Sequence, residues 1–161
     1  MREEKSLNDI KKEYSKLQKK YSLPSFEKLN EEFGIEKITE GETDFLLRKI
    51  RSQISEKFFS YLRFTETLLN PANAPMFVFS IVKAIDSEKR KNLNEIYKNL
   101  AKNEINVVEI DLDYSEEKEA EYIKDSHKLW LSIKKDMLEV IECVKKNWDN
   151  KTEGKSKGYF G

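Results

Sequence analysis

Side chains that commonly build metal centres are scarce in this sequence. It contains one cysteine, Cys143, and one histidine, His127. A single cysteine excludes an intrachain disulfide, and two residues of these types cannot supply the usual four ligands of a zinc site. The Glu-x-x-His pattern of di-iron bundles also fails, because Lys124 lies three residues before the histidine. We therefore expect no metal and no cofactor, with His127 on a helix surface or boundary and Cys143 as a small buried side chain.

Glycine is equally scarce, with five residues in the chain. None of them opens a helix after a strand, which excludes the common glycine-rich phosphate loops. The spacing of Asp111, Asp113 and Ser115 resembles the start of a calcium loop, but Glu116 stands where glycine is required and Tyr122 where the bidentate glutamate is required. Cys143 has no basic partner visible in the sequence, so no nucleophilic site is indicated. The sequence thus predicts a protein that is not an enzyme.

Long hydrophobic runs are absent as well. The most apolar run, residues 76–82, has seven residues, whereas a membrane-spanning helix needs about 20. The first residues include no apolar segment of the kind found in signal peptides. We therefore expect a cytoplasmic protein that does not associate with membranes.

Charged residues are abundant in this chain of 161 residues. They make up 37% of it, with 30 basic residues against 30 acidic ones, a composition typical of solvent-exposed helices with paired charges. The length suits one domain. We expect residues 1–148 to form a single helical domain and residues 149–161 a disordered C-terminal tail, because the tail has no apolar periodicity.

The clearest periodic signal lies near the N-terminus. Five apolar residues recur at steps of three and four, as in a heptad repeat: Leu7, Ile10, Tyr14, Leu17 and Tyr21. Two heptads are too short for an autonomous coiled coil, so this stripe needs a partner surface. Packing within the chain is the favoured interpretation, and docking on another protein is the alternative.

Three further segments have the periodicity and punctuation of helices. A short helix is predicted over residues 26–33, ending at Gly34 in a left-handed cap, and residues 36–42 are predicted to be a loop. A long helix is predicted from Thr43 or Asp44 to Leu69, where a segment with two prolines ends it. Another long helix is predicted over residues 115–148, with Ser115 as a plausible cap.

Two segments leave the choice between helix and strand open. Residues 76–85 and 105–112 have strand-like composition, but neither has an obvious partner strand, so helix is favoured for both. We expect the first of these segments to direct four side chains into the core: Phe77, Phe79, Ile81 and Val82. The predicted architecture is an all-α bundle of five or six helices, with the long helices 43–69 and 115–148 antiparallel.

Charge is unevenly distributed along the chain. Residues 104–125 contain nine acidic and two basic residues, a net charge of −7, whereas residues 45–103 contain eleven basic and five acidic residues, a net charge of +6. The favoured interpretation is that oppositely charged helices neutralise each other within one bundle. The alternative is a surface for a charged protein partner. Its candidate residues, besides the heptad, are Arg48, Lys49, Arg51, Lys57, Arg63, Glu109, Asp111, Asp113, Glu116 and Glu117.

The scarcity of catalytic groups, the heptad and the uneven charge together favour one functional class. We expect a non-catalytic helical module for protein interaction or assembly, which binds a protein partner or a second copy of itself. The alternative is an accessory subunit of a nucleic-acid or ribonucleoprotein complex that contacts phosphates through the basic helix face. It is less favoured, because the net charge of the whole chain is zero.

Overall fold

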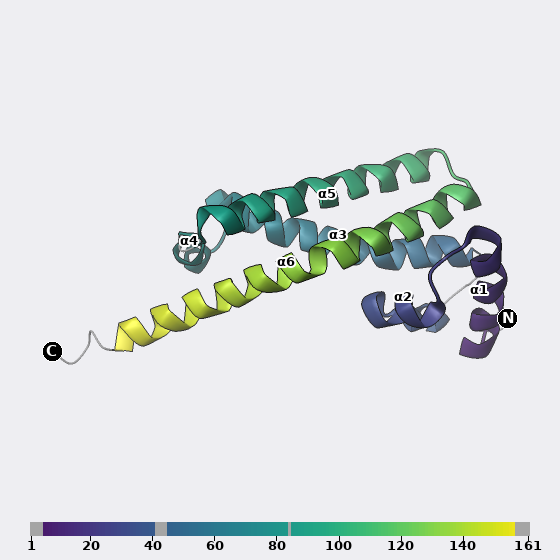
Figure 1. The fold of residues 1–161 in the computed structure, drawn as a ribbon, viewed down its shortest axis with the longest axis horizontal. Helices are drawn as coiled ribbons and strands as arrows, with labels where there is room; N and C mark the ends of the chain where they lie inside the picture. Colours follow the sequence, from purple (N-terminus) through teal and green to yellow (C-terminus); the bar gives the residue numbers. More distant parts are fainter. Residues whose placement is uncertain (1–4, 41–44, 84, 157–161) are drawn as a thin grey trace. The chain divides into compact units, whose positions relative to one another are not determined.

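The computed structural model describes residues 5–40, 45–83 and 85–156, and within these ranges every regular element is a helix (Figure 1). The order is α1 (Leu7–Tyr21), α2 (Phe26–Phe33), the 3₁₀ helix η1 (Ile35–Glu40), α3 (Leu46–Leu69), the 3₁₀ turn η2 (Pro71–Asn73), α4 (Met76–Val82), α5 (Ser87–Leu112) and α6 (Glu116–Ser156). The predicted all-α bundle is confirmed. The first ambiguous segment is helical over Met76–Val82, and the second is helical throughout and extends α5 to 26 residues.

Local sequence signals explain most of the helix ends. Ser6 and Asp9 form a reciprocal capping box at the start of α1, and Gly34 ends α2 with φ of 63°. Asp86 accepts a hydrogen bond from the backbone N–H of Lys89 at the start of α5. The Ser115 hydroxyl caps α6 in the same way, as predicted. The predicted caps Thr43 and Asp44 lie outside the described residues.

Two predicted boundaries are wrong. The segment expected to be a loop, residues 36–42, contributes to η1, which ends at Glu40. The last helix does not end at Trp148 but continues to Ser156, because the polar residues that follow the apolar stripe include no proline to interrupt it. The remaining residues of the predicted tail lie outside the described part. No helix among the described residues is long and apolar enough to cross a membrane.

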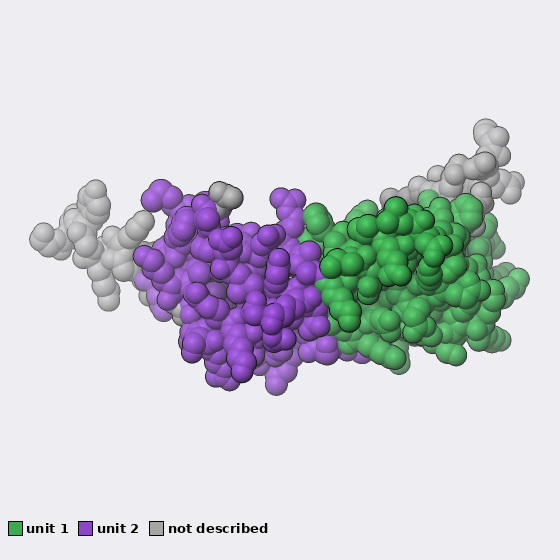
Figure 2. Space-filling view, turned by 90° about the horizontal axis from the view of Figure 1, so that it is seen from above, with its two compact units in different colours: residues 1–60, 102–130 green, residues 61–101, 131–161 purple. Residues whose placement is uncertain are grey.

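The chain divides into two compact units (Figure 2). Unit 1 comprises residues 1–60 and 102–130, and unit 2 comprises residues 61–101 and 131–161. The helices α3, α5 and α6 contribute residues to both units. No proline or glycine falls at the points where these helices pass from one unit to the other, so the sequence carries no signal of the division.

Within unit 1, α3 and α6 run in the same direction. Arg51 contacts Glu119 near the start of both segments, and Phe58 contacts Trp130 near the end of both. The antiparallel partner of α6 is α5, since Asn103 bonds to Ser126, whereas Asp111, further along α5, shares Arg51 with Glu119, which comes earlier in α6. The prediction that helices 43–69 and 115–148 pair in antiparallel fashion is therefore wrong for these two helices. In the sequence, α5 lies between α3 and α6 and runs in the opposite direction, so α3 and α6 are parallel to each other.

The core of unit 1 includes part of the N-terminal stripe. Ile10 and Tyr14 are buried, and the Tyr14 hydroxyl donates a hydrogen bond of 2.5 Å to the carbonyl oxygen of Pro24. Packing of these two residues within the chain is therefore confirmed. On α2, the ring of Phe33 lies edge-on to that of Phe58, with 5.8 Å between centroids. Such pairs contribute about 0.5–1.5 kcal/mol beyond the area they bury.

An apolar cluster of unit 2 forms around α4. Its buried residues come from four helices and the segment before α5: Leu68, Val78, Val82, Ile85, Leu93 and Val140. Ile81 is also buried, but Phe77 and Phe79 are 51% and 40% exposed. The prediction that all four apolar residues enter the core is thus wrong for these two. A helix presents one face to its neighbours, so a short helix that is apolar on every side must leave some of its side chains outside.

The difference in burial between Ile81 and Phe77 predicts unequal effects when each is replaced by alanine. Ile81→Ala should lower the free energy of unfolding by about 2–5 kcal/mol, because it removes buried methyl groups. Phe77→Ala should cost about 1 kcal/mol, since this ring keeps half of its surface in solvent and loses mainly its contact with Trp148. Urea denaturation of both variants measures the two values. Equal losses would contradict the orientation of α4.

Candidate functional site

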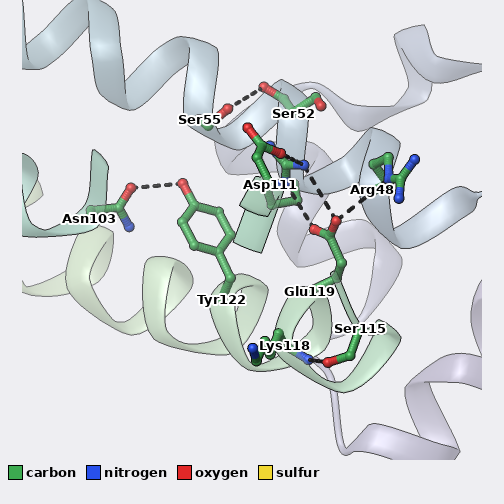
Figure 3. A network of polar contacts seen from close by, with 10 residues as sticks. Arg48, Ser52, Ser55, Asn103, Asp111, Ser115, Lys118, Glu119 and Tyr122 are labelled. Atoms are coloured by element: carbon green, nitrogen blue, oxygen red, sulfur yellow. Dashed lines mark hydrogen bonds and ion pairs between the residues drawn. The ribbon is translucent and has the colours of Figure 1, made fainter. Parts of the chain in front are cut away.

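A buried ion pair joins the helices of unit 1 (Figure 3). The Nε atom of Arg51 donates to Oε2 of Glu119 at 2.9 Å, and both side chains are buried. A second nitrogen of the same guanidinium donates to Oδ1 of Asp111 at 2.7 Å. Asp111 remains 58% exposed. One cation from α3 is therefore held between carboxylates from α5 and α6.

The surroundings of Arg51 favour its charged form. Burial acts to lower the pKa of the guanidinium, but its hydrogen bond and charge interaction with Glu119, together with those with Asp111, outweigh burial and raise the pKa. A buried ion loses its hydration, and here the carboxylates of Glu119 and Asp111 replace the lost water as partners of the guanidinium. The cluster thus holds three helices in one register.

Arg48 lies beside this ion pair but at the surface. Its Nε atom is 3.9 Å from Oε1 of Glu119. Its guanidinium also lies over two aromatic rings, 4.9 Å from the centroid of Phe45 and 4.1 Å from that of Tyr114. The flat guanidinium suits this stacking, which lysine reproduces poorly.

A second buried polar group connects α5 with α6 (Figure 3). The Tyr122 hydroxyl donates to Oδ1 of Asn103 at 2.7 Å, and Nδ2 of Asn103 donates to the Ser126 hydroxyl at 2.9 Å. Burial is the main cause that raises the pKa of Tyr122 to about 12. The phenol therefore stays protonated at neutral pH and acts as a hydrogen-bond donor.

Asn103, Glu119 and Ser126 were not identified from the sequence as members of these polar clusters. Extending the apolar stripe of α5 by steps of three and four from Leu93 reaches Asn103, and the same steps along α6 reach Glu119 and Ser126. A polar residue at such a position is a signal of a buried polar contact. It identifies the position but leaves the partner on another helix unknown.

The predicted N-terminal stripe is divided between core and surface. Ile10 and Tyr14 are buried, Leu17 and Tyr21 are half-buried, and Leu7 is 37% exposed. The Tyr21 hydroxyl donates to Oε1 of Glu116 at 2.6 Å, and Lys20 forms an ion pair with the same oxygen at 3.0 Å. These two hydrogen bonds hold the pKa of Glu116 below its ordinary value, and the bond from Tyr21 has the larger effect.

The other predicted charged residues do not form one site. Lys49 and Lys57 are half-buried in unit 1, whereas Arg63 is an exposed residue of unit 2. Asp113 pairs with Lys118 on the next helix, and Glu109 and Glu117 are exposed. Among all these candidates, the structure brings together Arg48, Arg51 and Asp111 around Glu119. This grouping agrees with the interpretation that charges neutralise each other within the bundle.

The polar clusters have the properties of structural contacts. Every carboxylate named in the Arg51 cluster faces a cation, and the buried side-chain nitrogen and oxygen atoms of the described residues all have hydrogen-bond partners. No group of three or more potential metal ligands occurs among the described side chains.

Apolar side chains at the surface form a more distinct candidate in unit 2. We call the exposed residues Met76, Phe77 and Phe79 of α4, together with Trp148 of α6, the α4 surface. Met76 is 89% exposed, and the rings of Phe77 and Trp148 meet edge-on with 5.6 Å between centroids. Beside them lies a groove of about 680 Å³, lined by Phe77, Ile81, Val144, Lys145, Trp148 and Asp149. None of the α4 surface residues was among the predicted binding residues.

Comparison with known proteins adds no relative. No protein-family model matches the chain, and neither the curated proteins nor the solved structures include a significant match.

The buried ion pair predicts a strongly non-additive pair of substitutions. Arg51→Leu should lower the free energy of unfolding by about 3–5 kcal/mol, because the buried carboxylate of Glu119 loses the hydrogen bonds from Arg51 and keeps only the longer contact with Arg48. The double variant Arg51→Leu/Glu119→Leu should recover most of this loss. Asp111→Asn serves as the control and should cost less than about 1 kcal/mol, since this side chain is largely exposed. Urea denaturation tests this cycle, and equal losses in the single and double variants would refute the ion-pair assignment.

The contact between Tyr21 and Glu116 predicts a pH-dependent effect. The pKa of Glu116 is lower in the folded chain than its ordinary value of 4.5, so its charge stabilises the fold above pH 4.5 and stops doing so as the pH falls through the lower folded value. Glu116→Gln should reduce the free energy of unfolding by up to about 1 kcal/mol at pH 7, because the site is partly exposed. The difference from wild type should shrink below pH 4.5. Denaturation at pH 7 and pH 3 measures it, and a larger difference at pH 3 is the contrary result.

Proposed function

We propose that this protein is a non-catalytic helical assembly module, which associates with a second copy of itself through the α4 surface. The observation that supports the proposal is the exposure of Met76, Phe77 and Phe79 on one short helix, together with an apolar groove that Phe77 lines. Exposed apolar side chains beside a groove mark interaction sites in soluble proteins.

The shape and charge of the α4 surface suit a second copy. A two-fold interface brings the same patch of both copies together, so the patch must contain both a projection and a recess. Met76 supplies the projection and the neighbouring groove supplies the recess. The groove also has one cation, Lys145, and one anion, Asp149. A two-fold arrangement can set each of these opposite the other, which avoids contact between like charges.

The size of the surface sets the expected strength of association. With about 200 Å² for each large side chain, the exposed parts of the four residues amount to roughly 450 Å² per copy. Two copies would bury about 900 Å², which is below the roughly 1,200 Å² of stable specific interfaces and in the range of weak, transient ones. We therefore expect a reversible dimer with a dissociation constant in the micromolar range rather than an obligate one.

The nucleic-acid alternative has less support. Its proposed basic face includes Arg51, but this side chain is buried against two carboxylates and does not reach solvent phosphates. Arg48 is partly engaged by Glu119 and two aromatic rings.

Sedimentation velocity over a range of protein concentrations tests self-association. The average mass of the wild type should rise towards that of a dimer at concentrations of about 10–100 μM, as expected for a small apolar interface. Met76→Ser/Phe79→Ser should remain monomeric, because it removes exposed apolar surface. The matched control is Leu138→Ser, which changes an apolar residue of unit 2 that is 56% exposed but lies outside the α4 surface.

The control should associate like the wild type. A wild type that stays monomeric across this range, or a double variant that associates equally well, would contradict the proposal. Circular dichroism verifies that each variant retains its helices.

A further inference from the structure

The part of α5 that belongs to unit 1 has a second apolar stripe, separate from the one in the core. Ile105 is 68% exposed, Val108 is 52% exposed and Leu112 is 84% exposed. Their spacing of three and four residues places them on one face of the helix. On another face of the same segment, Asn103, Val107 and Ile110 are buried. This segment therefore has an apolar face that its own unit does not cover, which we call the α5 seam.

Acidic residues border the α5 seam. In heptad terms Ile105, Val108 and Leu112 occupy the a and d positions, and the four flanking e and g positions are Lys102, Glu104, Glu109 and Asp111. Three of these four are acidic, and the exposed carboxylate of Glu109 lies next to Val108 along the chain. Asp111 keeps 58% of its side chain exposed while it binds Arg51. Flanking charges of this kind select the partner of a helical seam.

We propose that the α5 seam binds an amphipathic helix of another protein whose apolar stripe is bordered by lysine or arginine residues. Apolar anchors at helical spacing fit the stripe of a second helix, and basic flanks complement the acidic border. This interaction involves unit 1 and a different protein. It is therefore independent of the proposed self-association, which involves unit 2.

The charge of the border argues against other occupants. A second copy of this seam would bring acidic residues against acidic residues, which is unfavourable. Nucleic acids and anionic membrane surfaces are repelled for the same reason. An amphipathic helix with basic flanks is therefore complementary both to the apolar stripe and to its acidic border.

Two synthetic peptides test this specificity on the full-length protein. Both are three heptads long with leucine at every a and d position, and they differ in having lysine or glutamate at every e and g position. Binding is measured by fluorescence anisotropy of the labelled peptides. The lysine peptide should bind about tenfold more tightly than the glutamate peptide. This is the change expected from a net gain of two surface ion pairs over two contacts between like charges, since Lys102 offsets one of the three acidic positions. Its affinity should fall as salt is added, because the charges are exposed.

Variants of exposed residues locate the binding site. Ile105→Ser/Val108→Ser should weaken binding of the lysine peptide about tenfold or more, as expected for removal of central apolar anchors. Glu104→Lys/Glu109→Lys should reverse the preference between the two peptides. Leu131→Ser, which changes an apolar residue of α6 that is 55% exposed, is the matched control and should bind like the wild type. Circular dichroism verifies that the variants are folded.

Several results would overturn the proposal. They are the absence of binding by either peptide, equal affinity for both peptides, and undiminished binding by Ile105→Ser/Val108→Ser. The variant Met76→Ser/Phe79→Ser separates the two proposals, because it should lose self-association but retain peptide binding. Loss of peptide binding in this variant would place the peptide on the α4 surface instead.

Discussion

The buried charge of Arg51 is the constraint on which the arrangement of unit 1 depends. A guanidinium without water needs carboxylates at hydrogen-bonding distance, and here they come from two different helices, as Glu119 of α6 and Asp111 of α5. Sliding either helix by one turn, about 5.4 Å, would break these bonds. Apolar contacts alone tolerate such shifts more easily, since they have little directionality. The ion pair therefore specifies one register among the apolar packings that the stripes allow.

The hydrogen bonds of Asn103 add a second constraint to the same helices. Its amide contacts both Tyr122 and Ser126, which fixes α5 against α6 one to two turns from the ion pair. Buried polar side chains with all their partners present favour a unique arrangement, because any other register leaves a polar group unsatisfied. Unit 2 has a different basis, since the cluster around α4 is apolar.

Apolar residues outside these cores are the basis of both proposed interactions. Helix α4 is too short and too uniformly apolar to bury all of its side chains, and the end of α5 has apolar residues on two faces. The two surfaces differ in charge. The groove beside α4 has one residue of each sign, which suits a second copy, whereas the α5 seam has an acidic border, which suits a basic partner. One small helical protein would in this way connect copies of itself to another protein.

The amino-acid sequence by itself determined the helical class, most of the helices and several caps, because the 3.6-residue period and residues such as Ser6, Gly34 and Ser115 act within a few positions of the chain. It indicated part of the buried stripe, as Ile10 and Tyr14 show. Only the tertiary structure decided that α3 and α6 are parallel, that Arg51 pairs with Glu119, and that Met76 and Ile105 remain outside. Periodicity defines which residues share a face of a helix. Which faces meet, and which stay exposed, depends on contacts between helices that are distant in the sequence, such as the 68 residues that separate Arg51 from Glu119.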